Sequence, residues 1–280
     1  MSTRRFVLLA AGALIALSQP AAAAEDKALK AAVAGAQRGE THVARDAARH
    51  PYETLAFWGV KPKQTIIEIS PGSGYWTEIL GPYAKATGGT YVAGVGDLAN
   101  PKMTDAGRKA RADFEAKYAD EAKFGKISYV GFGAVSGPLG APGSADMVIT
   151  ARNIHNWMWT EGMVDKSMKD FATVLKKGGV LAVEEHRADP TRDQIADARD
   201  GYVSTANVIA AAEKAGFKLA AKSEVNANPK DTKDHPFGVW TLPPSRWTVQ
   251  GGRSQDPAFD RARYDAIGES DRMTLRFVKK

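Results

Sequence analysis

The chain has 280 residues, with 38 Lys and Arg against 32 Asp and Glu, and it contains no cysteine. The small positive excess is spread along the chain, and no basic block interleaves with aromatic residues, which excludes the usual signature of a nucleic-acid-binding protein. The lack of cysteine excludes disulfides and fits an oxidising compartment without proving one. This length suits one domain with a decorated edge, or a domain with a small subdomain.

The first 24 residues have the features of a secretory signal peptide. Arg4 and Arg5 precede an apolar run over 6–17, which is shorter than the about 20 residues that a membrane-spanning helix needs. Ala22 and Ala24 then provide small side chains of the A-x-A type that signal peptidase accepts. We expect residues 1–24 to be removed and the mature chain to be periplasmic or secreted, without a membrane partner. The alternative is an uncleaved membrane anchor.

Residues 25–63 are predicted to form an N-terminal helical segment. Residues 25–50 are rich in Ala and in charged residues, which favours helix, and no strand signal occurs there. Pro51 at a first helical position and Glu53 in the first turn open a second short helix over 51–60.

From residue 64 to 280 the pattern alternates between strands and helices. Strands are predicted at 65–70, 89–95, 126–132, 145–151, 180–186, 216–226 and 273–280, and helices at 75–84, 101–123, 160–176 and 203–215. Such alternation predicts an α/β, Rossmann-like domain with a mostly parallel sheet and helices on both faces. Residues 226–264 form a long insertion, which we expect to be functional or packed by its own side chains.

The first predicted strand leads into a glycine-rich turn. Glu68 lies on the strand, and Gly72 and Gly74 lie in the turn before the helix. A side chain at either glycine would keep a ligand away from the backbone, and the helix N-terminus offers unpaired N–H groups. The alternative is an ordinary tight turn between a strand and a helix.

At these residues the chain resembles the class I methyltransferases that depend on S-adenosylmethionine (SAM), and in particular a group of predicted bacterial methyltransferases, many with signal peptides. The resemblance is carried, in chain order, by RDAARHPYETLAFWGVKP, EISPGSGYWTEILGPY, ADMVITARNIHNW, LKKGGVLAVEEHRA, NANPKDTKDHPFGVWTLPP and SDRMTLRF. It implies a seven-stranded sheet with an antiparallel last strand, and SAM bound over the C-terminal edge of the first strands.

The resemblance also implies which residues bind the cofactor: Glu68, Ser70, Gly72, Gly74, Asp97 and Asn153. Three positions depart from the wider SAM-binding class. Ser70 replaces the first glycine of the turn, Gly96 stands where an acid normally ends the second strand, and 131–133 offers no acid or amide to the adenine. A buried ribose without its acceptor loses a charge-assisted hydrogen bond of ~1.5–3 kcal/mol.

Polar residues follow the fourth and fifth predicted strands. Ligands of open α/β sheets bind outside the carboxyl ends of the strands, so His155, Glu185 and His186 are expected at one rim. His155 is the predicted general base or substrate-orienting group, because imidazole titrates near neutral pH. His186 or Glu185 would assist it. Each histidine has the alternative of a hydrogen-bonded structural role.

Further residues are candidates for substrate binding. Arg49 and His50 belong to a segment that the resemblance suggests is a lid, and the alternative is a helix N-terminus held by an Asp–Arg pair. Trp157 lies at the same rim as His155. Asp234 and His235 are candidates in a segment that is also typical of turns. A metal site of His155, His186 and His235 with a carboxylate was weighed, but no ligand spacing supports it, so no metal is predicted.

The sequence therefore predicts a SAM-dependent methyltransferase that acts on a small-molecule acceptor in the cell envelope. The alternative is a secreted, catalytically inactive protein that binds a small ligand on the same fold. A metal-assisted hydrolase is a third hypothesis, which depends on the histidines. The oligomeric state is not predicted.

Overall fold

The computed structural model describes residues 25–191 and 198–280. The predicted signal peptide, residues 1–24, lies outside the described residues. In these two ranges the helices are all too short or too polar to span a bilayer.

A seven-stranded sheet forms the centre of the molecule, in the order β3-β2-β1-β4-β5-β8-β6. Its strands are β1 (Thr65–Ile69), β2 (Thr90–Gly96), β3 (Ile127–Phe132), β4 (Ala145–Ala151), β5 (Leu175–His186), β6 (Phe217–Ser223) and β8 (Arg272–Lys279). Strands β1 to β5 pair in parallel, and β8 is antiparallel to both β5 and β6. The predicted Rossmann-like sheet, with its antiparallel last strand, is confirmed.

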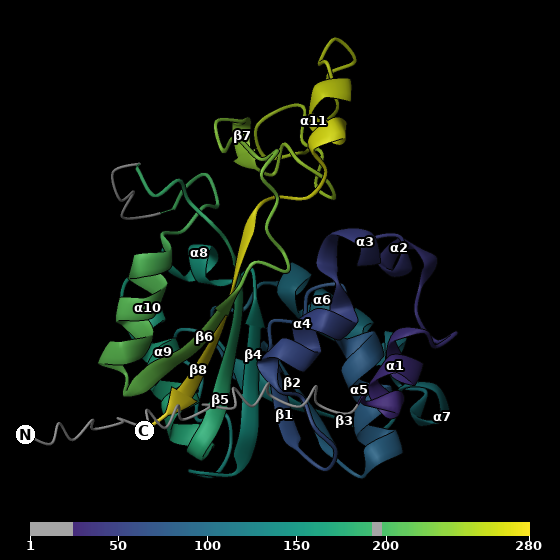
Figure 1. Cartoon of the computed structure of the whole chain (residues 1–280), viewed down its shortest axis with the longest axis vertical. Coiled ribbons are helices and arrows are strands. Elements are labelled where there is room, and N and C mark those ends of the chain that lie inside the picture. Colours follow the sequence, from purple (N-terminus) through teal and green to yellow (C-terminus); the bar gives the residue numbers. More distant parts are fainter. Residues whose placement is uncertain (1–24, 192–197) are drawn as a thin grey trace, which may run out of the picture.

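Helices cover both faces of this sheet (Figure 1). The helices among the described residues are α1 (Lys27–Val33), α2 (Glu40–Val43), α3 (Asp46–Arg49), α4 (Pro51–Trp58), α5 (Thr77–Thr87), α6 (Asp105–Lys117), α7 (Glu121–Phe124), α8 (Ile154–Trp157), α9 (Met163–Val174), α10 (Thr205–Lys214) and α11 (Ala262–Ile267), of which α11 lies beyond the sheet. Pro51 is the first residue of α4, as predicted. The helical stretch predicted over 25–50 consists of three short helices, α1, α2 and α3.

Two further boundaries differ from the prediction. The helix expected over 101–123 is split into α6 and α7, because the Asp120 side chain accepts hydrogen bonds from two backbone N–H groups and so starts a new helix. Strand β5 begins at Leu175, not at residue 180, and Leu175 pairs with Ala145. Gly178, with a φ of 76°, lies within the strand at an irregularity of the pairing and does not end the preceding helix.

The side chains of β1 alternate between two hydrophobic cores. Ile66 belongs to the core that includes residues of α1, α4 and α5. Ile67 belongs to the core on the other face, which includes residues of α9 and α10. This alternation follows from the two-residue period of a strand, and it places Glu68 on the same face as Ile66.

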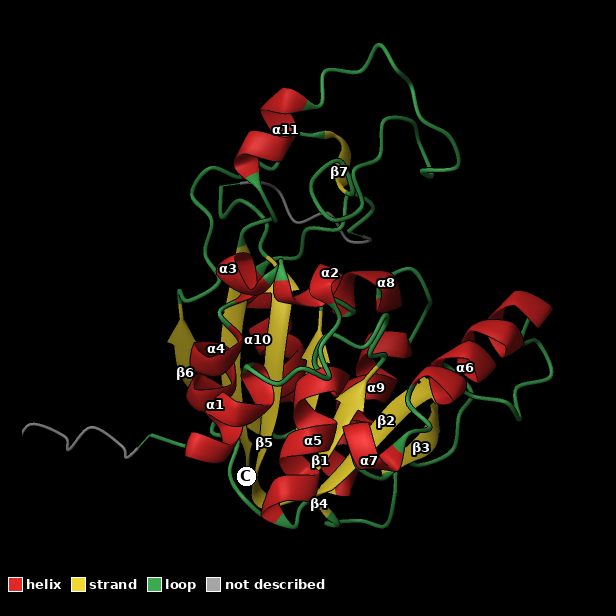
Figure 2. Cartoon of the chain, turned by 90° about the vertical axis from the view of Figure 1, so that its right-hand side faces the viewer, coloured by secondary structure: helices red, strands yellow, loops and turns green. Residues whose placement is uncertain are grey.

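The insertion over 226–264 lies beyond the carboxyl ends of the parallel strands (Figures 1 and 2). It contains the short strand β7 (Pro236–Val239) and leads into α11, neither of which was predicted. Its tryptophans pack on each other, with the rings of Trp240 and Trp247 stacked at a centroid distance of 5.3 Å. The helices α2, α3 and α8 lie at the same edge of the sheet (Figure 2).

Candidate functional site

A cavity of about 240 Å³ lies at the carboxyl ends of β1 and β4, the place that the sheet topology predicts. One wall is the turn over 69–76, and the opposite wall is formed by 151–156 and His186. Residues 239–245 of the insertion and Glu269 and Ser270 before β8 complete it, together with Arg49 from α3. Ser70, Gly72, Asn153, His155, His186, Arg49 and Glu68 are thus brought together from the predicted site.

The two predicted glycines of the turn have different roles. Gly72 lines the cavity, has a φ of 60°, and would have no heavy atom within 4 Å of an added Cβ. At Gly74, with a φ of 91°, an added Cβ would lie 1.8 Å from the hydroxyl oxygen of Tyr118. Gly74 is therefore required by a packed tyrosine, whereas Gly72 leaves open backbone toward the cavity. Ser70 also has a left-handed backbone, with a φ of 50°.

Glu68 lies at the base of this turn and is buried. The hydroxyl of Thr77 donates a hydrogen bond to it over 3.1 Å, and the hydroxyl of Tyr91 donates a second. Burial raises its pKa to about 7, although these two hydrogen bonds act in the opposite direction. Glu68 therefore connects β1, α5 and β2 beneath the turn.

Asp97 and Asn153, both predicted to bind the cofactor, are engaged with the protein itself. Asp97 lies outside the cavity, accepts a hydrogen bond from the N–H of Ala99 at 3.0 Å, and packs against Gly131 on β3. The amide of Asn153 donates to the carbonyl of Ile69 at 2.9 Å, so it ties the turn to the end of β4. Among the residues that line the cavity, no carboxylate comes from the end of β2.

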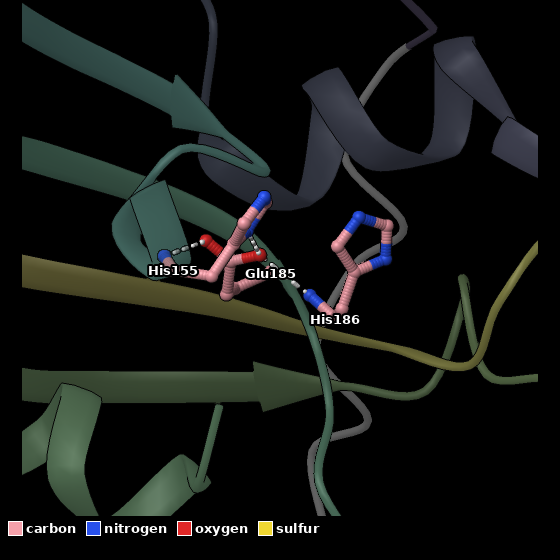
Figure 3. A group of neighbouring side chains, drawn as sticks. All are labelled: His155, Glu185 and His186. Atoms are coloured by element: carbon pink, nitrogen blue, oxygen red, sulfur yellow. Dashed lines mark hydrogen bonds and ion pairs between the residues drawn. The ribbon is translucent and has the colours of Figure 1, made fainter. Parts of the chain in front are cut away.

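His155 and Glu185 form a buried pair at the opposite wall (Figure 3). The Nδ1–H group of His155 donates to Oε1 of Glu185 at 2.9 Å. Glu185 is held in turn by the backbone N–H groups of Ile154 at 2.6 Å and of His186 at 2.8 Å. No described residue forms a hydrogen bond with Nε2 of His155. A carboxylate at Nδ1 fixes the tautomer that leaves Nε2 free to accept a proton.

His186 lies beside this pair, with its ring centroid 5.3 Å from that of His155. Its Nδ1 is 2.5 Å from the hydroxyl oxygen of Ser270. Burial, together with the nearby positive charges, lowers the pKa of His186 well below its ordinary value, so its ring is neutral near pH 7.

The ligand atoms of His155, Glu185 and His186 lie within 4.8 Å of one another, which is close enough for a metal ion. Two observations weigh against a cation there. Both oxygens of Glu185 already accept hydrogen bonds from the protein, and the guanidinium groups of Arg152 and Arg272 lie near His186. His235, the third histidine considered, lies outside the cavity.

An arginine cluster, defined as Arg45, Arg49, Arg152 and Arg272 with Glu184 and Glu269, lies at one side of the cavity, which Arg49, Arg152 and Glu269 line. The carboxylate of Glu269 forms ion pairs with three guanidinium groups, those of Arg45 at 2.5 Å, Arg49 at 3.1 Å and Arg272 at 2.7 Å. Arg272 forms a second ion pair with Glu184 at 3.0 Å. Burial alone would raise the pKa of Glu269, but Arg49, Arg272 and Arg45 lower it far below its ordinary value. Burial and the charge of Arg152 lower the pKa of Arg49 to about 9.

The N-terminal segment packs over the glycine-rich turn. Nε2 of His42 lies 3.0 Å from the hydroxyl oxygen of Ser73, and Nδ1 lies 2.8 Å from Glu78. The predicted Asp–Arg pair exists with a different partner, because Asp46 binds Arg38 at 2.5 and 2.7 Å, while Arg49 binds Glu269. The segment thus both covers the turn and is held by ion pairs.

Four predicted substrate-binding residues do not line the cavity. His50 lies between α3 and α4 with a φ of 41°. Trp157 packs against Phe132 and Phe171 in the core. The other two belong to a turn: Asp234 is exposed and accepts a hydrogen bond from Thr232, and His235 is buried against Asp231 at 2.8 Å. The interpretation of 228–236 as a turn therefore accounts for its contacts.

Several lining residues escaped the sequence reasoning, namely Trp240, Pro243, Pro244, Ser245, Glu269 and Ser270. Most come from segments far apart in the chain. The motifs over 226–244 and 270–277 were the available signal, since Trp240 and Ser270 lie within them.

Comparisons with known proteins support the fold. No protein-family model and no curated protein matches the chain. Among solved structures, a protein described as a sarcosine dimethylglycine methyltransferase from Galdieria sulphuraria is 12% identical, with a TM-score of 0.52, over 91% of this chain and 99% of that one. The geranyl diphosphate C-methyltransferase of Streptomyces coelicolor, solved with S-adenosyl-L-homocysteine, is 13% identical, with a TM-score of 0.51, over 90% and 87%.

The [4+2]-cyclase SpnF is also similar, at 14% identity and a TM-score of 0.51, over 90% of this chain and 91% of that one. Such identities establish the fold alone: this chain has the Rossmann-like fold of the class I SAM-dependent methyltransferases. A cyclase with the same fold shows that the reaction has to be argued from the site.

Proposed function

We propose that this protein is a SAM-dependent methyltransferase acting on a small-molecule acceptor in the cell envelope. The observation that carries the proposal is the His155–Glu185 pair, because His155 lines the same cavity as the open backbone at Gly72. A proton acceptor and a ligand-binding turn are thus combined in one enclosed site.

The residues at the turn fit the cofactor in part. Gly72 leaves open backbone, and Ser70, Ser73 and Glu68 line the same cavity. Asp97 does not reach the cavity, so any contact to the ribose comes from elsewhere. When bound, SAM supplies an electrophilic methyl group.

The residues of this chain would prepare the acceptor. His155 takes the proton of an acceptor hydroxyl, amine or thiol on Nε2, while Glu185 stabilises the imidazolium that forms. The backbone donors to Glu185 hold it in place, so the pair needs no rearrangement during the step. Residues of 239–245 line the same cavity and would limit the access of water to it.

Export remains part of the proposal. Mass spectrometry of the protein recovered from the periplasmic fraction checks it, and a mature N-terminus near Glu25 is the expected result. A full-length chain in the membrane fraction would support an uncleaved anchor instead.

A catalytically inactive, secreted small-ligand-binding protein is the second candidate. The displaced Asp97 favours it, since an intact enzyme of this fold usually holds the ribose with an acid at the end of β2. Calorimetry of the mature chain with SAM and S-adenosylhomocysteine tests the shared requirement. If neither ligand gives binding heat at millimolar concentration, the methyltransferase proposal fails.

The variant His155→Gln separates the two candidates. We expect methyl transfer to fall by about 10²–10⁴-fold while SAM affinity stays unchanged, because a positioned base contributes roughly that factor. Trp157→Phe, a change in the core outside the cavity, serves as the control. Equal activity of His155→Gln and the unmodified protein would contradict the role of His155.

A further inference from the structure

Arg49 carries unused hydrogen-bond donors at the cavity wall. Its side chain is fully buried, and its Nε donates to Glu269 at 3.1 Å. Its Nη1 and Nη2 have no hydrogen-bond partner among the described residues. The guanidinium group lies 4.4 Å from the ring centroid of Tyr75, which fixes its plane beside the cavity. Buried donors without an acceptor are costly, so such groups call for an explanation.

Arg152 lies at the same cavity, and its side chain has even fewer hydrogen-bond partners than that of Arg49. Its backbone has a φ of 59°, in the region that favours glycine, and its N–H donates to the carbonyl of Glu184 at 2.7 Å. Its side chain forms no hydrogen bond or ion pair with any residue in the described part of the chain, and its Nε is buried. Strained backbone of this kind collects at ligand-binding positions.

The surrounding charge has a definite sign. The arginine cluster contains four guanidinium groups and two carboxylates. Of the two other carboxylates nearby, Glu68 lines the cavity, has its pKa raised by burial to about 7 and accepts hydrogen bonds from Thr77 and Tyr91. Glu185 is already occupied by His155 and by backbone N–H groups. This excess of positive charge repels a metal cation and attracts an anion. Guanidinium groups match the two oxygens of a carboxylate or phosphate particularly well.

We propose that Arg49 and Arg152 together bind an oxyanion, a carboxylate or phosphate carried by the small molecule that occupies this cavity. The identity of that molecule rests on the function proposed above. The binding of an oxyanion does not depend on that function, because simple anions can probe the site without SAM. The oxyanion belongs either to the acceptor or to the amino-acid end of the cofactor.

The first experiment measures the Tm of the mature chain with acetate and with phosphate, at ionic strength matched by sodium chloride. Acetamide is the uncharged control for acetate. At a concentration about a hundredfold above Kd we expect the Tm to rise by roughly 5–10 °C. The rise should be absent with acetamide.

Arg152→Met tests the assignment. Because this guanidinium has no protein partner, we expect the variant to keep or raise its Tm without anion and to lose the rise with acetate or phosphate. Arg152→Lys should recover part of the rise, since it restores the charge without the planar fork. Arg246→Met, at an arginine whose partner Asp265 lies in α11 outside the cavity, should keep the full rise.

Two ligands then distinguish the sources. S-adenosylhomocysteine carries the amino-acid carboxylate, and methylthioadenosine lacks the amino-acid group. If Arg152→Met lowers the affinity for S-adenosylhomocysteine at least tenfold and leaves the affinity for methylthioadenosine unchanged, the oxyanion is that of the cofactor. If both affinities stay unchanged while the anion response is lost, the oxyanion is that of the acceptor.

The proposal is overturned if acetate and phosphate raise the Tm of the unmodified protein and of Arg152→Met equally, or raise neither. It is also overturned if Arg152→Met is strongly destabilised without anion, since the guanidinium would then have a structural partner. Failure of SAM to bind, with a normal anion response, would defeat the proposed function and leave the anion site standing.

Discussion

The two walls of the cavity are built on opposite principles. The wall at the turn after β1 presents the small residues Ser70, Gly72 and Ser73, while Asp97, the acid after β2, lies outside the cavity and is bound to its own loop. The wall at β4, β5 and the N-terminal segment concentrates buried charge around Glu269. The first wall leaves space for a ligand, and the second provides a preorganised electrostatic field. Selectivity for a ligand should therefore reside mainly in the second wall.

The largest effect is expected at the charged wall. Glu269→Gln removes the carboxylate that Arg45, Arg49 and Arg272 share, so three guanidinium groups lose their common partner. We expect the free energy of unfolding to fall by about 3–5 kcal/mol, measured by urea denaturation at pH 7. Asp97→Asn, next to the other wall but outside the cavity, keeps its acceptor oxygen, and its free energy of unfolding should stay within about 0.5 kcal/mol of the unmodified protein. If both variants lost the same free energy of unfolding, the contrast between the charged wall and the small-residue wall would be contradicted.

The glycine-rich turn offers a matched pair within the small-residue wall. Gly74→Ala combines a left-handed backbone with a collision against Tyr118, so we expect a loss of about 2–5 kcal/mol. Gly72→Ala bears only the backbone cost of about 1–2 kcal/mol, because its surroundings are open. The same urea titrations check both. A larger loss at Gly72 would show that the turn is packed differently.

The pH dependence of stability should report on Glu68, the acid beneath the turn. Its pKa in the folded protein is about 7, above the ordinary 4.5, so the folded state holds a proton that the unfolded state releases. Stability from this group is therefore lost as the pH rises from about 4.5 through 7.

Glu68→Gln does not titrate, so its stability relative to the unmodified protein should increase between pH 5 and pH 8, by at most on the order of 3 kcal/mol. Urea titrations at four pH values measure the difference, which cancels the titration of all other groups. A difference that does not change with pH would contradict the buried, protonated state of Glu68.

The smallest effect concerns the ligand affinity of the first wall. If SAM and its product bind as proposed, Asp97→Ala should change the Kd of S-adenosylhomocysteine by less than about threefold, because Asp97 lies outside the cavity. An acid that holds the ribose would contribute about 1.5–3 kcal/mol, roughly 10–150-fold. Calorimetry measures this Kd, and an affinity that falls tenfold or more would show that Asp97 turns toward the ligand on binding.

Local patterns in the sequence were sufficient for the sheet. Strands β1 and β4 carry β-branched runs that are buried on both faces, and α9 has a face of apolar residues, so the alternation could be identified segment by segment. Boundaries failed where a single side chain decides them, as at Asp120, or where a glycine sits inside a strand, as at Gly178.

The candidate site was only half predictable, for a physical reason. Glu185 lies in the last two residues of β5, and His155 and Gly72 follow the ends of β4 and β1. Topology alone brings these strand ends together. Trp240 and Glu269 reach the cavity through loops, and Arg152 is significant through a missing partner, which only the packed structure reveals. Asp234 and His235 looked equally polar, yet their contacts with Thr232 and Asp231 hold a turn together.

Strand β8 lies inside the sheet, between β5 and β6, although it comes last in chain order. The sheet therefore has a gap until this segment inserts, and β6 has no neighbour to pair with before then. Glu269, directly ahead of β8, reaches Arg45 across 224 positions of sequence. Such distant contacts form slowly during folding. During biosynthesis, the field at the cavity would thus be absent until the final segment inserts, so a partly folded chain has no working site.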